Sequence, residues 1–222
     1  MDKLKGAIFD LDGTLFDSLW VWEEIDLRFL SKRGIAVPPD YSQSIGALSF
    51  RQTAEYTVQR FKLAETPESL MQEWMEMSRE AYANEIRLKK GAKEFLIRLK
   101  EMGVKLAVAT SSTPDLYVPA LINNGIYELF SAVVDTTTER SKDHPDIYLA
   151  AAKKLGVSPA ECAVFEDLPV AVDSAKRGGF FTVAVYDDHY KGAKNGFDKA
   201  DLFVYGYEEL MQGEFLHKCG GR

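Results

Sequence analysis

Residues 7–15 read Ala-Ile-Phe-Asp-Leu-Asp-Gly-Thr-Leu, an apolar run that ends in two carboxylates and a glycine turn. Side chains at positions i and i+2 of a strand lie on the same face, so Asp10 and Asp12 can converge on one reacting centre. The two anions repel each other unless a divalent cation neutralises them or one of them keeps its proton, and both conditions suit phosphoryl chemistry. The simpler interpretation is a strand end followed by an Asx turn, in which Asp and Gly are common.

The composition limits the kinds of protein this chain can be. It has 222 residues, 46% of them apolar, which is enough for one large domain or for a core domain with a small insert. With 27 basic and 34 acidic residues the formal net charge is −7, which argues against a nucleic-acid partner and favours a soluble protein. No stretch approaches the length of a membrane helix and the N-terminus has no cleavage pattern, so we expect a cytoplasmic protein without a membrane partner. We also expect a monomer.

The cysteine content predicts no disulfide framework. Cys162 lies in an apolar predicted strand and Cys219 in a Gly-rich tail, and together they match no metal-binding spacing. Both are therefore expected to be free thiols, with Cys162 buried. The tail from residue 213 to 222 is polar enough to be partly disordered.

The order of predicted helices and strands indicates two domains. Residues 17–87 show helical spacing throughout, with a first helix ending near Gly34, a loop over 35–44, and helices at about 50–61 and 67–82. Strands are then predicted at 104–109, 132–134, 163–165, 181–185 and 202–204, alternating with helices at 91–102, after Pro114, at 145–155, at about 169–176 and near Glu208. This alternation predicts an α/β fold, a Rossmann-like parallel sheet with helices on both faces. We expect a core domain of residues 1–16 and 88–222 and an inserted small all-helical domain of residues 17–87.

Polar residues follow the predicted strand 104–109, at the edge where ligands bind in an open parallel sheet. They are Thr110, Ser111, Ser112 and Thr113, just before a predicted helix. A hydroxyl and free backbone N–H groups at a helix N-terminus bind phosphate well, because the unpaired donors and the helix dipole both favour an anion. The alternative is an ordinary N-cap of Ser and Thr.

Lys142 lies in a polar loop over residues 140–146, just before a predicted helix. A lysine in such a loop is usually a solvated surface charge. However, an acidic chain that binds phosphate needs a cation beside its nucleophile, and Lys supplies a compact point charge. His144 in the same loop is assigned no catalytic role.

A second pair of acids, Glu166 and Asp167, follows the predicted strand 163–165. Carboxylate oxygens of this kind suit Mg²⁺, which takes a few protein carboxylates together with water and a substrate phosphate oxygen. The alternative is a helix N-cap, which fits Asp167 ahead of Pro169 better than it fits Glu166.

Taken together, these motifs resemble those of the haloacid dehalogenase (HAD) superfamily of phosphatases. The run Asp10–Thr14 resembles the first motif, Thr110 the second, Lys142 the third and Glu166-Asp167 the fourth, in the right order along the core. The helical insert resembles a type-1 cap, and the nearest subfamily contains beta-phosphoglucomutase and phosphoglycolate-type phosphatases. The chain departs from that subfamily at three positions. Asp143 lies where Pro is common, Leu168 where Ser or Thr is frequent, and Ala171 where Gly is frequent.

The resemblance implies a Mg²⁺-dependent phosphatase that hydrolyses a small phosphorylated metabolite through an aspartyl phosphate. It makes Asp10 the nucleophile and Asp12 the general acid and base. It places the metal on Asp10, the Asp12 backbone carbonyl, Asp167 and, as a further candidate, Glu166; it places the phosphate on Thr110, the Ser111 amide and Lys142. The cap would close over the site, hinged near residues 15–18 and 86–90, and its candidate substrate contacts are Trp20, Trp22, Glu23 and Arg51.

Several alternatives remain open from the sequence. A phosphosugar mutase needs a cap that holds a bisphosphate in two orientations, and no motif marks such a site. A phosphonatase needs a Schiff-base lysine in the run 46–51, which has none, and a dehalogenase has no use for Asp12. A non-enzymatic binding module on the same fold would tolerate loss of these motif residues, yet all four motifs contain competent residues.

Overall fold

The computed structural model describes residues 4–45, 48, 50–136, 142–189, 196–212 and 215–216. Cys219 lies outside the described residues, as do most of the tail from residue 213 and part of the run 46–51. The chain divides into two compact units, unit 1 with Met1–Leu19 and Ile86–Arg222, and unit 2 with Trp20–Glu85. Unit 2 begins at residue 20 where the sequence predicted 17, and ends at 85 where it predicted 87.

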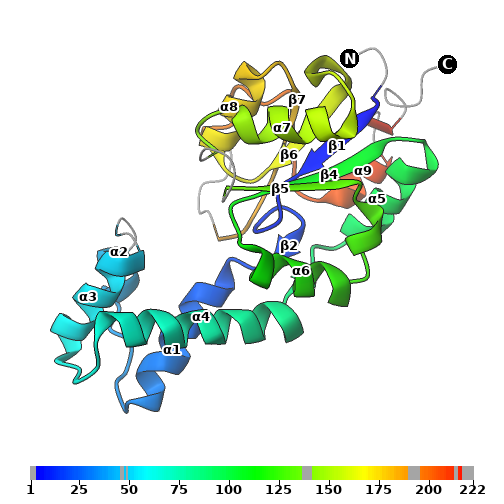
Figure 1. The fold of residues 1–222 in the computed structure, drawn as a ribbon. Coiled ribbons are helices and arrows are strands. Elements are labelled where there is room, and N and C mark those ends of the chain that lie inside the picture. Colours follow the sequence, from blue (N-terminus) through cyan, green and yellow to red (C-terminus); the bar gives the residue numbers. More distant parts are fainter. Residues whose placement is uncertain are drawn as a thin grey trace. The chain divides into compact units, whose positions relative to one another are not determined.

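Unit 1 contains a six-stranded parallel sheet, which confirms the predicted fold class (Figure 1). The strand order is β5-β4-β1-β6-β7-β8. The strands are β1 (Gly6–Phe9), β4 (Lys105–Thr110), β5 (Ala132–Asp135), β6 (Cys162–Glu166), β7 (Phe181–Val185) and β8 (Leu202–Val204). The chain fills one side of β1 with β4 and β5 and then crosses to the other side with β6, so the order of strands reverses at β1. In open α/β sheets this switch point is where ligands bind.

Helices cover both faces of this sheet. On one face α7 (Asp146–Leu155) packs on β1, β4 and β5, and α8 (Pro169–Arg177) packs on β6 and β7. On the other face α5 (Ala92–Glu101) packs on β4 and on α9 (Tyr207–Gln212). The helix α6 (Pro114–Asn123) follows β4 and contacts the short helix at Tyr127–Leu129. The near-continuous apolar runs of the central strands β1 and β6 follow from this double coverage, because both of their faces are buried.

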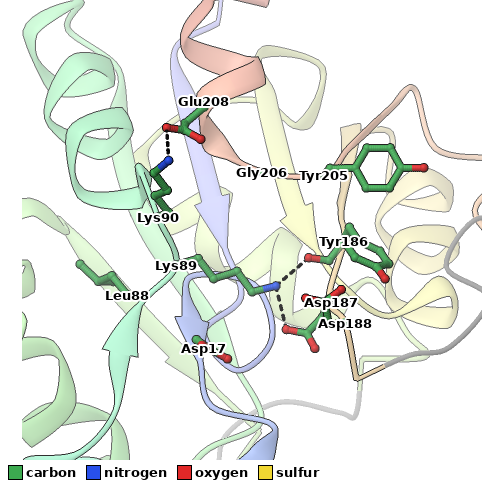
Figure 2. A pocket seen from close by; sticks show the side chains of 10 residues that line it. All are labelled: Asp17, Leu88, Lys89, Lys90, Tyr186, Asp187, Asp188, Tyr205, Gly206 and Glu208. Carbon is green, nitrogen blue, oxygen red and sulfur yellow. Dashed lines mark hydrogen bonds and ion pairs between the residues drawn. The ribbon is translucent and has the colours of Figure 1, made fainter.

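Two short strands connect unit 1 with the insert. Strand β2 (Phe16–Asp17) pairs antiparallel with β3 (Arg87–Leu88). The prediction that residues 17–87 contain no strand is therefore wrong at both ends, because strands of two residues are too short to show an alternating pattern. Directly after β3, Lys89 donates a 2.7 Å hydrogen bond to the Tyr186 carbonyl and lies 2.8 Å from an Asp187 oxygen, in a cavity of 360 Å³ (Figure 2). Lys89 thus connects the β2–β3 pair with the loop that follows β7.

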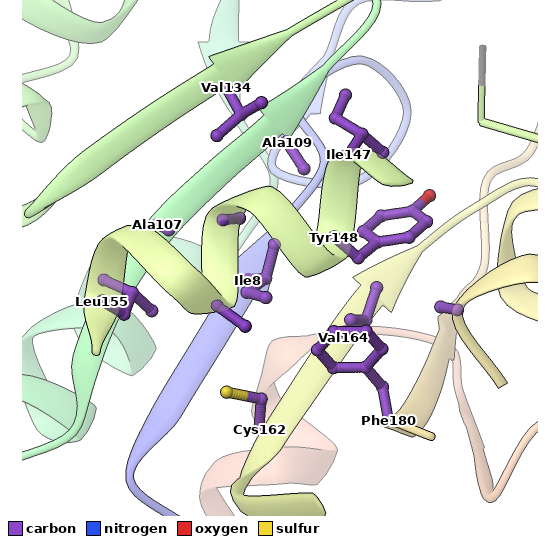
Figure 3. Packing of buried hydrophobic residues seen from close by; sticks show 13 residues of the cluster. Ile8, Ala107, Ala109, Val134, Ile147, Tyr148, Leu155, Cys162, Val164 and Phe180 are labelled. Carbon is purple, nitrogen blue, oxygen red and sulfur yellow. The ribbon is translucent and has the colours of Figure 1, made fainter. Parts of the chain in front are cut away.

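The two faces of the sheet have different cores. Ile8 and Val164 pack under α7 with Tyr148 (Figure 3). Because side chains alternate along a strand, Phe9 packs on the opposite face, against Phe95 of α5. On that opposite face the rings of Phe9 and Phe165 stack with centroids 4.3 Å apart. Each buried aromatic or branched side chain contributes about 1.5–3 kcal/mol of burial free energy, so both faces stabilise the position of β1.

Cys162 lies in the core under α7, and its thiol is free, as predicted. Burial, with a smaller effect from the neighbouring Glu161, raises the pKa of the Cys162 thiol to about 12. A thiol that stays protonated is a poor nucleophile and a poor metal ligand. Cys162 is therefore a packing residue.

Unit 2 is helical throughout its described residues (Figure 1). It contains α1 (Trp20–Lys32), α2 (Tyr41–Ile45), α3 (Phe50–Phe61) and α4 (Pro67–Asn84). Helix α4 begins where the sequence predicts, because Thr66 accepts a 3.2 Å hydrogen bond from the Ser69 amide and Pro67 occupies the first turn. Helix α2 overlaps the predicted loop 35–44, since a helix of five residues has too little periodicity to be recognised. In the described parts of both units, the helices are too short or too polar to cross a lipid bilayer.

Candidate active site

The strand register brings the predicted site residues to one edge of the sheet. Phe9, the last residue of β1, lies opposite Val108 of β4 and Phe165 of β6. Asp10 follows directly, and its backbone N–H donates a 3.1 Å hydrogen bond to the Phe165 carbonyl. Thr110 ends β4, and Glu166 ends β6 just before Asp167. Residues separated by more than a hundred positions in the sequence therefore meet at the carboxyl ends of three adjacent strands.

Gly13 allows the loop after β1 to lie against the end of β6. Its φ angle is +76°, and a Cβ at this position would collide with the Asp167 carboxylate. Thr14, the next residue, donates a 3.0 Å hydrogen bond from Oγ1 to Asp167 Oδ1. Its carbonyl accepts a 3.1 Å hydrogen bond from the buried hydroxyl of Tyr207. The loop and the fourth-motif acid thus hold each other in place.

Three buried acids form a cluster at this edge. Oxygens of Asp10, Glu166 and Asp167 all lie within 4.8 Å of one another. Lys142 is buried beside them, and its ammonium donates hydrogen bonds to Asp10 Oδ1 and to Glu166 Oε1, the latter at 2.6 Å. The same Glu166 oxygen accepts a 2.7 Å hydrogen bond from the hydroxyl of Tyr148 in α7. The loop that contains Lys142 is thus connected with β1 and β6.

The pKa values of these groups reflect burial and crowding of like charge. Burial raises the pKa of Asp10 well above its usual range, and the neighbouring carboxylates add to this, while the charge of Lys142 opposes it. Burial and the Glu166 charge raise the pKa of Asp167 to about 7. Burial alone would lower the pKa of Lys142, but the charges of Asp10 and Glu166 outweigh burial and raise it. The cluster therefore has more negative charge than one ammonium can balance.

The donor set of this cluster fits a divalent cation. Glu166 Oε2 and Asp167 Oδ2 are buried and accept no hydrogen bond from any described residue. Buried acceptors without a partner cost free energy, and a bound cation removes that cost. Three carboxylates in close proximity are hard oxygen ligands of the kind that Mg²⁺ takes. The residues present are thus chemically suited to hold Mg²⁺.

Asp12 lies outside the acid cluster and is held by two serines. Its Oδ1 accepts a 2.7 Å hydrogen bond from Ser18, and its Oδ2 accepts a 2.6 Å hydrogen bond from Ser112. The sequence placed Ser112 only in the polar run after β4 and residue 18 only in the expected hinge over 15–18. Both have a hydroxyl on a residue next to a predicted motif, which is the signal that could have identified them.

The polar run after β4 forms a turn at the same edge. Thr110 is fully buried, and its hydroxyl accepts a 3.0 Å hydrogen bond from the Ser112 amide. The Ser111 carbonyl accepts a 3.4 Å hydrogen bond from Thr136, which follows β5. This turn fixes the position of the Ser112 hydroxyl and leaves the Ser111 side chain exposed.

A sequence model of the haloacid dehalogenase-like hydrolases matches residues 7–185, a range that contains the acid cluster, Lys142, Asp12 and the polar run after β4. The chain belongs to the haloacid dehalogenase-like hydrolases. Beta-phosphoglucomutase of Bacillus subtilis (strain 168) is 30% identical over 233 residues, which cover 97% of this chain and 95% of that protein. Hexitol phosphatase A of Escherichia coli (strain K12) is 31% identical over 213 residues, which cover 94% of each protein.

Solved structures of this HAD family share the fold. A family IA hydrolase from Entamoeba histolytica has a TM-score of 0.76 at 24% identity, and the match covers 97% of this chain and 99% of that one. Beta-phosphoglucomutase from Clostridium difficile has a TM-score of 0.71 at 22% identity, and the match covers 97% of both chains. The family model and the two relatives confirm the resemblance inferred from the motifs. They also confirm the expected enzyme class, a phosphoric monoester hydrolase of the HAD type.

Proposed function

We propose that this HAD-like hydrolase is a Mg²⁺-dependent phosphatase that hydrolyses a small phosphorylated metabolite, a phosphosugar or a similar phosphomonoester. The main support is the cluster of Asp10, Glu166 and Asp167 around Lys142, with two buried acceptor atoms that lack a partner among the described residues. Such a cluster suits an ion and a phosphoryl group better than it suits a solely structural role. The names of two relatives, beta-phosphoglucomutase and hexitol phosphatase A, support a phosphorylated sugar or sugar alcohol as the substrate class.

In the first half-reaction Asp10 attacks phosphorus and an aspartyl phosphate forms, while the bond from phosphorus to the leaving alcohol breaks. Asp12 gives its proton to that alcohol oxygen. Lys142, which donates a hydrogen bond to Asp10, supplies positive charge beside the transferring phosphoryl group. Thr110 and the Ser111 amide would bind the oxygens of this phosphoryl group. Splitting the displacement in two lets one carboxylate provide the nucleophile and another provide the proton.

In the second half-reaction water attacks the phosphorus, Asp12 takes a proton from that water, and the bond between phosphorus and Asp10 breaks. Inorganic phosphate leaves, and Asp12 is again protonated for the next cycle. The two serines that bind Asp12 Oδ1 and Oδ2 hold this carboxyl in one orientation for both steps. An oriented carboxyl of this kind contributes about 10²–10⁴-fold to a rate as a general acid and base.

The groups that would hold Mg²⁺ are Asp10, the Asp12 backbone carbonyl, Asp167 and Glu166. When bound, the ion would cancel charge between the anionic nucleophile and the anionic phosphate. The buried acceptors Glu166 Oε2 and Asp167 Oδ2 support this assignment. We propose that unit 2 acts as the cap and supplies contacts to the leaving group.

An aryl phosphate with Mg²⁺ tests the proposal. We expect hydrolysis by the full-length protein, and a phosphoprotein that can be trapped by acid quench and cleaved by hydroxylamine, as an acyl phosphate is. Asp10→Asn should abolish both signals. A matched control is Asp173→Asn, because Asp173 lies on α8 and pairs with Lys199 at the surface. A broad panel of phosphate esters with no turnover would instead favour a binding module.

A mutase is the second candidate, because the beta-phosphoglucomutase of Bacillus subtilis matches 97% of this chain. A mutase returns the phosphoryl group to another hydroxyl of the sugar, whereas a phosphatase releases it to water. Incubation with a hexose monophosphate separates the two: we expect release of inorganic phosphate. A positional isomer without phosphate release would favour the mutase.

A further inference from the structure

Unit 2 contains a cavity of 240 Å³ that lies among its own helices. Its described wall is mostly apolar, with one carboxylate, one hydroxyl group and two indole N–H groups, of which the Trp74 Nε1 is buried without a partner among the described residues. It is lined by Trp22, Ile25, Asp26, Ile45, Leu48, Phe50, Thr53 and Trp74. Trp22 is one of the substrate contacts suggested by the sequence, but nothing in the following argument depends on the phosphate site.

Three aromatic rings in this wall are inclined to one another. The rings of Trp22 and Phe50 have centroids 6.0 Å apart and an interplanar angle of 69°. Those of Phe50 and Trp74 are 5.7 Å apart at 54°. At these angles the rings are not stacked face to face. An organic cation is attracted to the electron-rich faces of aromatic rings, and several rings around one site increase this attraction.

Asp26 is the one charged side chain among the described residues that line the cavity, and it has no hydrogen bond or ion pair with a described residue. The arginines nearest in sequence are paired with other acids. These pairs are Arg28 with Glu24 and Glu85, Arg33 with Glu65 and Glu73, Arg51 with Glu55 and Glu68, and Arg60 with Asp40. Burial, and then the charge of Glu23, raises the pKa of Asp26 to about 7. No described cation thus balances the negative charge of the ionised Asp26 carboxylate, and a positively charged ligand would balance it.

Other ligand classes fit this wall less well. A polyol would leave several of its hydroxyl groups unpaired, because the polar side-chain groups that line the cavity are Asp26, Thr53 and the indole N–H groups of Trp22 and Trp74. An anion would be repelled by the Asp26 carboxylate. A purely apolar ligand would leave the Asp26 carboxylate buried without a partner, which costs free energy.

We propose that this cavity binds a small organic cation, with an alkylated ammonium group among the rings of Trp22, Phe50 and Trp74 and its charge opposite Asp26. The size of the cavity suits a fragment of a few heavy atoms. The proposal concerns unit 2 alone and is independent of the proposed phosphatase activity.

The test compares choline and tetramethylammonium with 3,3-dimethylbutan-1-ol, the uncharged isostere of choline. The full-length protein is titrated without phosphate or Mg²⁺, with tryptophan fluorescence and calorimetry as readouts. All three tryptophans, Trp20, Trp22 and Trp74, lie in unit 2, so the fluorescence reports on this unit. We expect both cations to bind, and choline to bind about ten-fold or more tightly than the alcohol, as one cation–π contact with a charge partner predicts.

Two variants make the test specific. Asp26→Asn keeps the shape of the cavity, and it should weaken choline binding about ten-fold and remove the preference over the alcohol. Glu23→Gln is the matched control, because it removes a neighbouring charge from the same helix without changing the lining, and it should change the affinity by less than about two-fold. The proposal is overturned if neither cation binds, if the alcohol or sorbitol binds as tightly as choline, or if Asp26→Asn leaves the preference unchanged.

Discussion

The hydroxyl of Tyr148 donates a 2.7 Å hydrogen bond to Glu166 Oε1, the same oxygen that accepts a hydrogen bond from Lys142. Both donors occupy one side of the carboxylate, so Oε2 remains as a buried acceptor with no partner among the described residues. Glu166 cannot turn without losing two hydrogen bonds. A residue of the helical layer thereby determines which carboxylate oxygen is available to a cation.

Tyr148→Phe should weaken Mg²⁺ binding by about ten-fold, because loss of a hydrogen bond to a metal-binding residue typically reduces affinity 10–100-fold. The substitution keeps the ring and its edge contact with Phe180. Calorimetric titration of the phosphate-free protein with Mg²⁺ measures the change. Tyr117→Phe is the control, since it removes a similar hydrogen bond to Asp135, outside the acid cluster. Equal Mg²⁺ affinity in both variants would contradict the positioning role.

Lys142→Met should lower the rate of aryl phosphate hydrolysis by about 10²–10³-fold, because a buried cation that stabilises the transferring group is lost. It should also destabilise the Mg²⁺-free protein by about 3–5 kcal/mol, since the acids it balances stay buried. Mg²⁺ should restore part of that stability, as a second source of positive charge. Urea unfolding with and without Mg²⁺ measures this recovery.

The control for this substitution is Lys89→Met. Lys89 is also largely buried and pairs with Asp187 at 2.8 Å, but it lies in the cavity beside β3. We expect it to lower stability with little dependence on Mg²⁺. If Mg²⁺ restores both variants equally, the cation does not replace the charge of Lys142.

Gly13→Ala should destabilise unit 1 by about 2–3 kcal/mol and abolish hydrolysis, because it combines an unfavourable positive φ with a steric conflict. The added Cβ would meet the Asp167 carboxylate and displace either the loop or the acid. Gly103→Ala separates the two causes. Gly103 has a φ of +80° and no neighbouring atom within 4 Å, so it should cost only the backbone contribution, about 1 kcal/mol, and keep activity. Chemical denaturation and an aryl phosphate assay of both variants measure the difference.

Much of the sheet could be predicted because its strands are buried on both faces. Apolar runs bounded by polar or glycine residues gave the limits of Phe181–Val185 and Leu202–Val204 as the structure has them. The strands at residues 16–17 and 87–88 were missed, because a two-residue ladder depends on where the two segments meet and not on any local pattern. The same reason applies to α2, whose five residues show little periodicity.

The site likewise contains features that could be predicted from the sequence and features that could not. The approach of Asp10 to Glu166 follows from a general rule on strand ends in parallel sheets. The position of Lys142 could be assigned from the resemblance alone, because a lysine in a polar loop has no periodic signal. The hydrogen bond of Tyr148 could not be predicted, since an aromatic residue at helical spacing indicates a core position, and the partner of its hydroxyl depends on packing between α7 and β6.

Asp26→Asn should change how the stability of unit 2 depends on pH. The pKa of Asp26 rises from an ordinary 3.8 to about 7 in the folded state, so between these values the folded protein binds more protons than the unfolded one. The free energy of unfolding of the wild type should therefore fall as pH rises from about 4 to about 7, and the variant should lack this fall. Because Asp26 is only partly buried, we expect solvent to reduce the effect to about 1–2 kcal/mol. Urea unfolding followed by tryptophan fluorescence at pH 5 and pH 8 measures the free energy of unfolding of both proteins. If the difference between variant and wild type is the same at both pH values, Asp26 ionises normally in the folded protein.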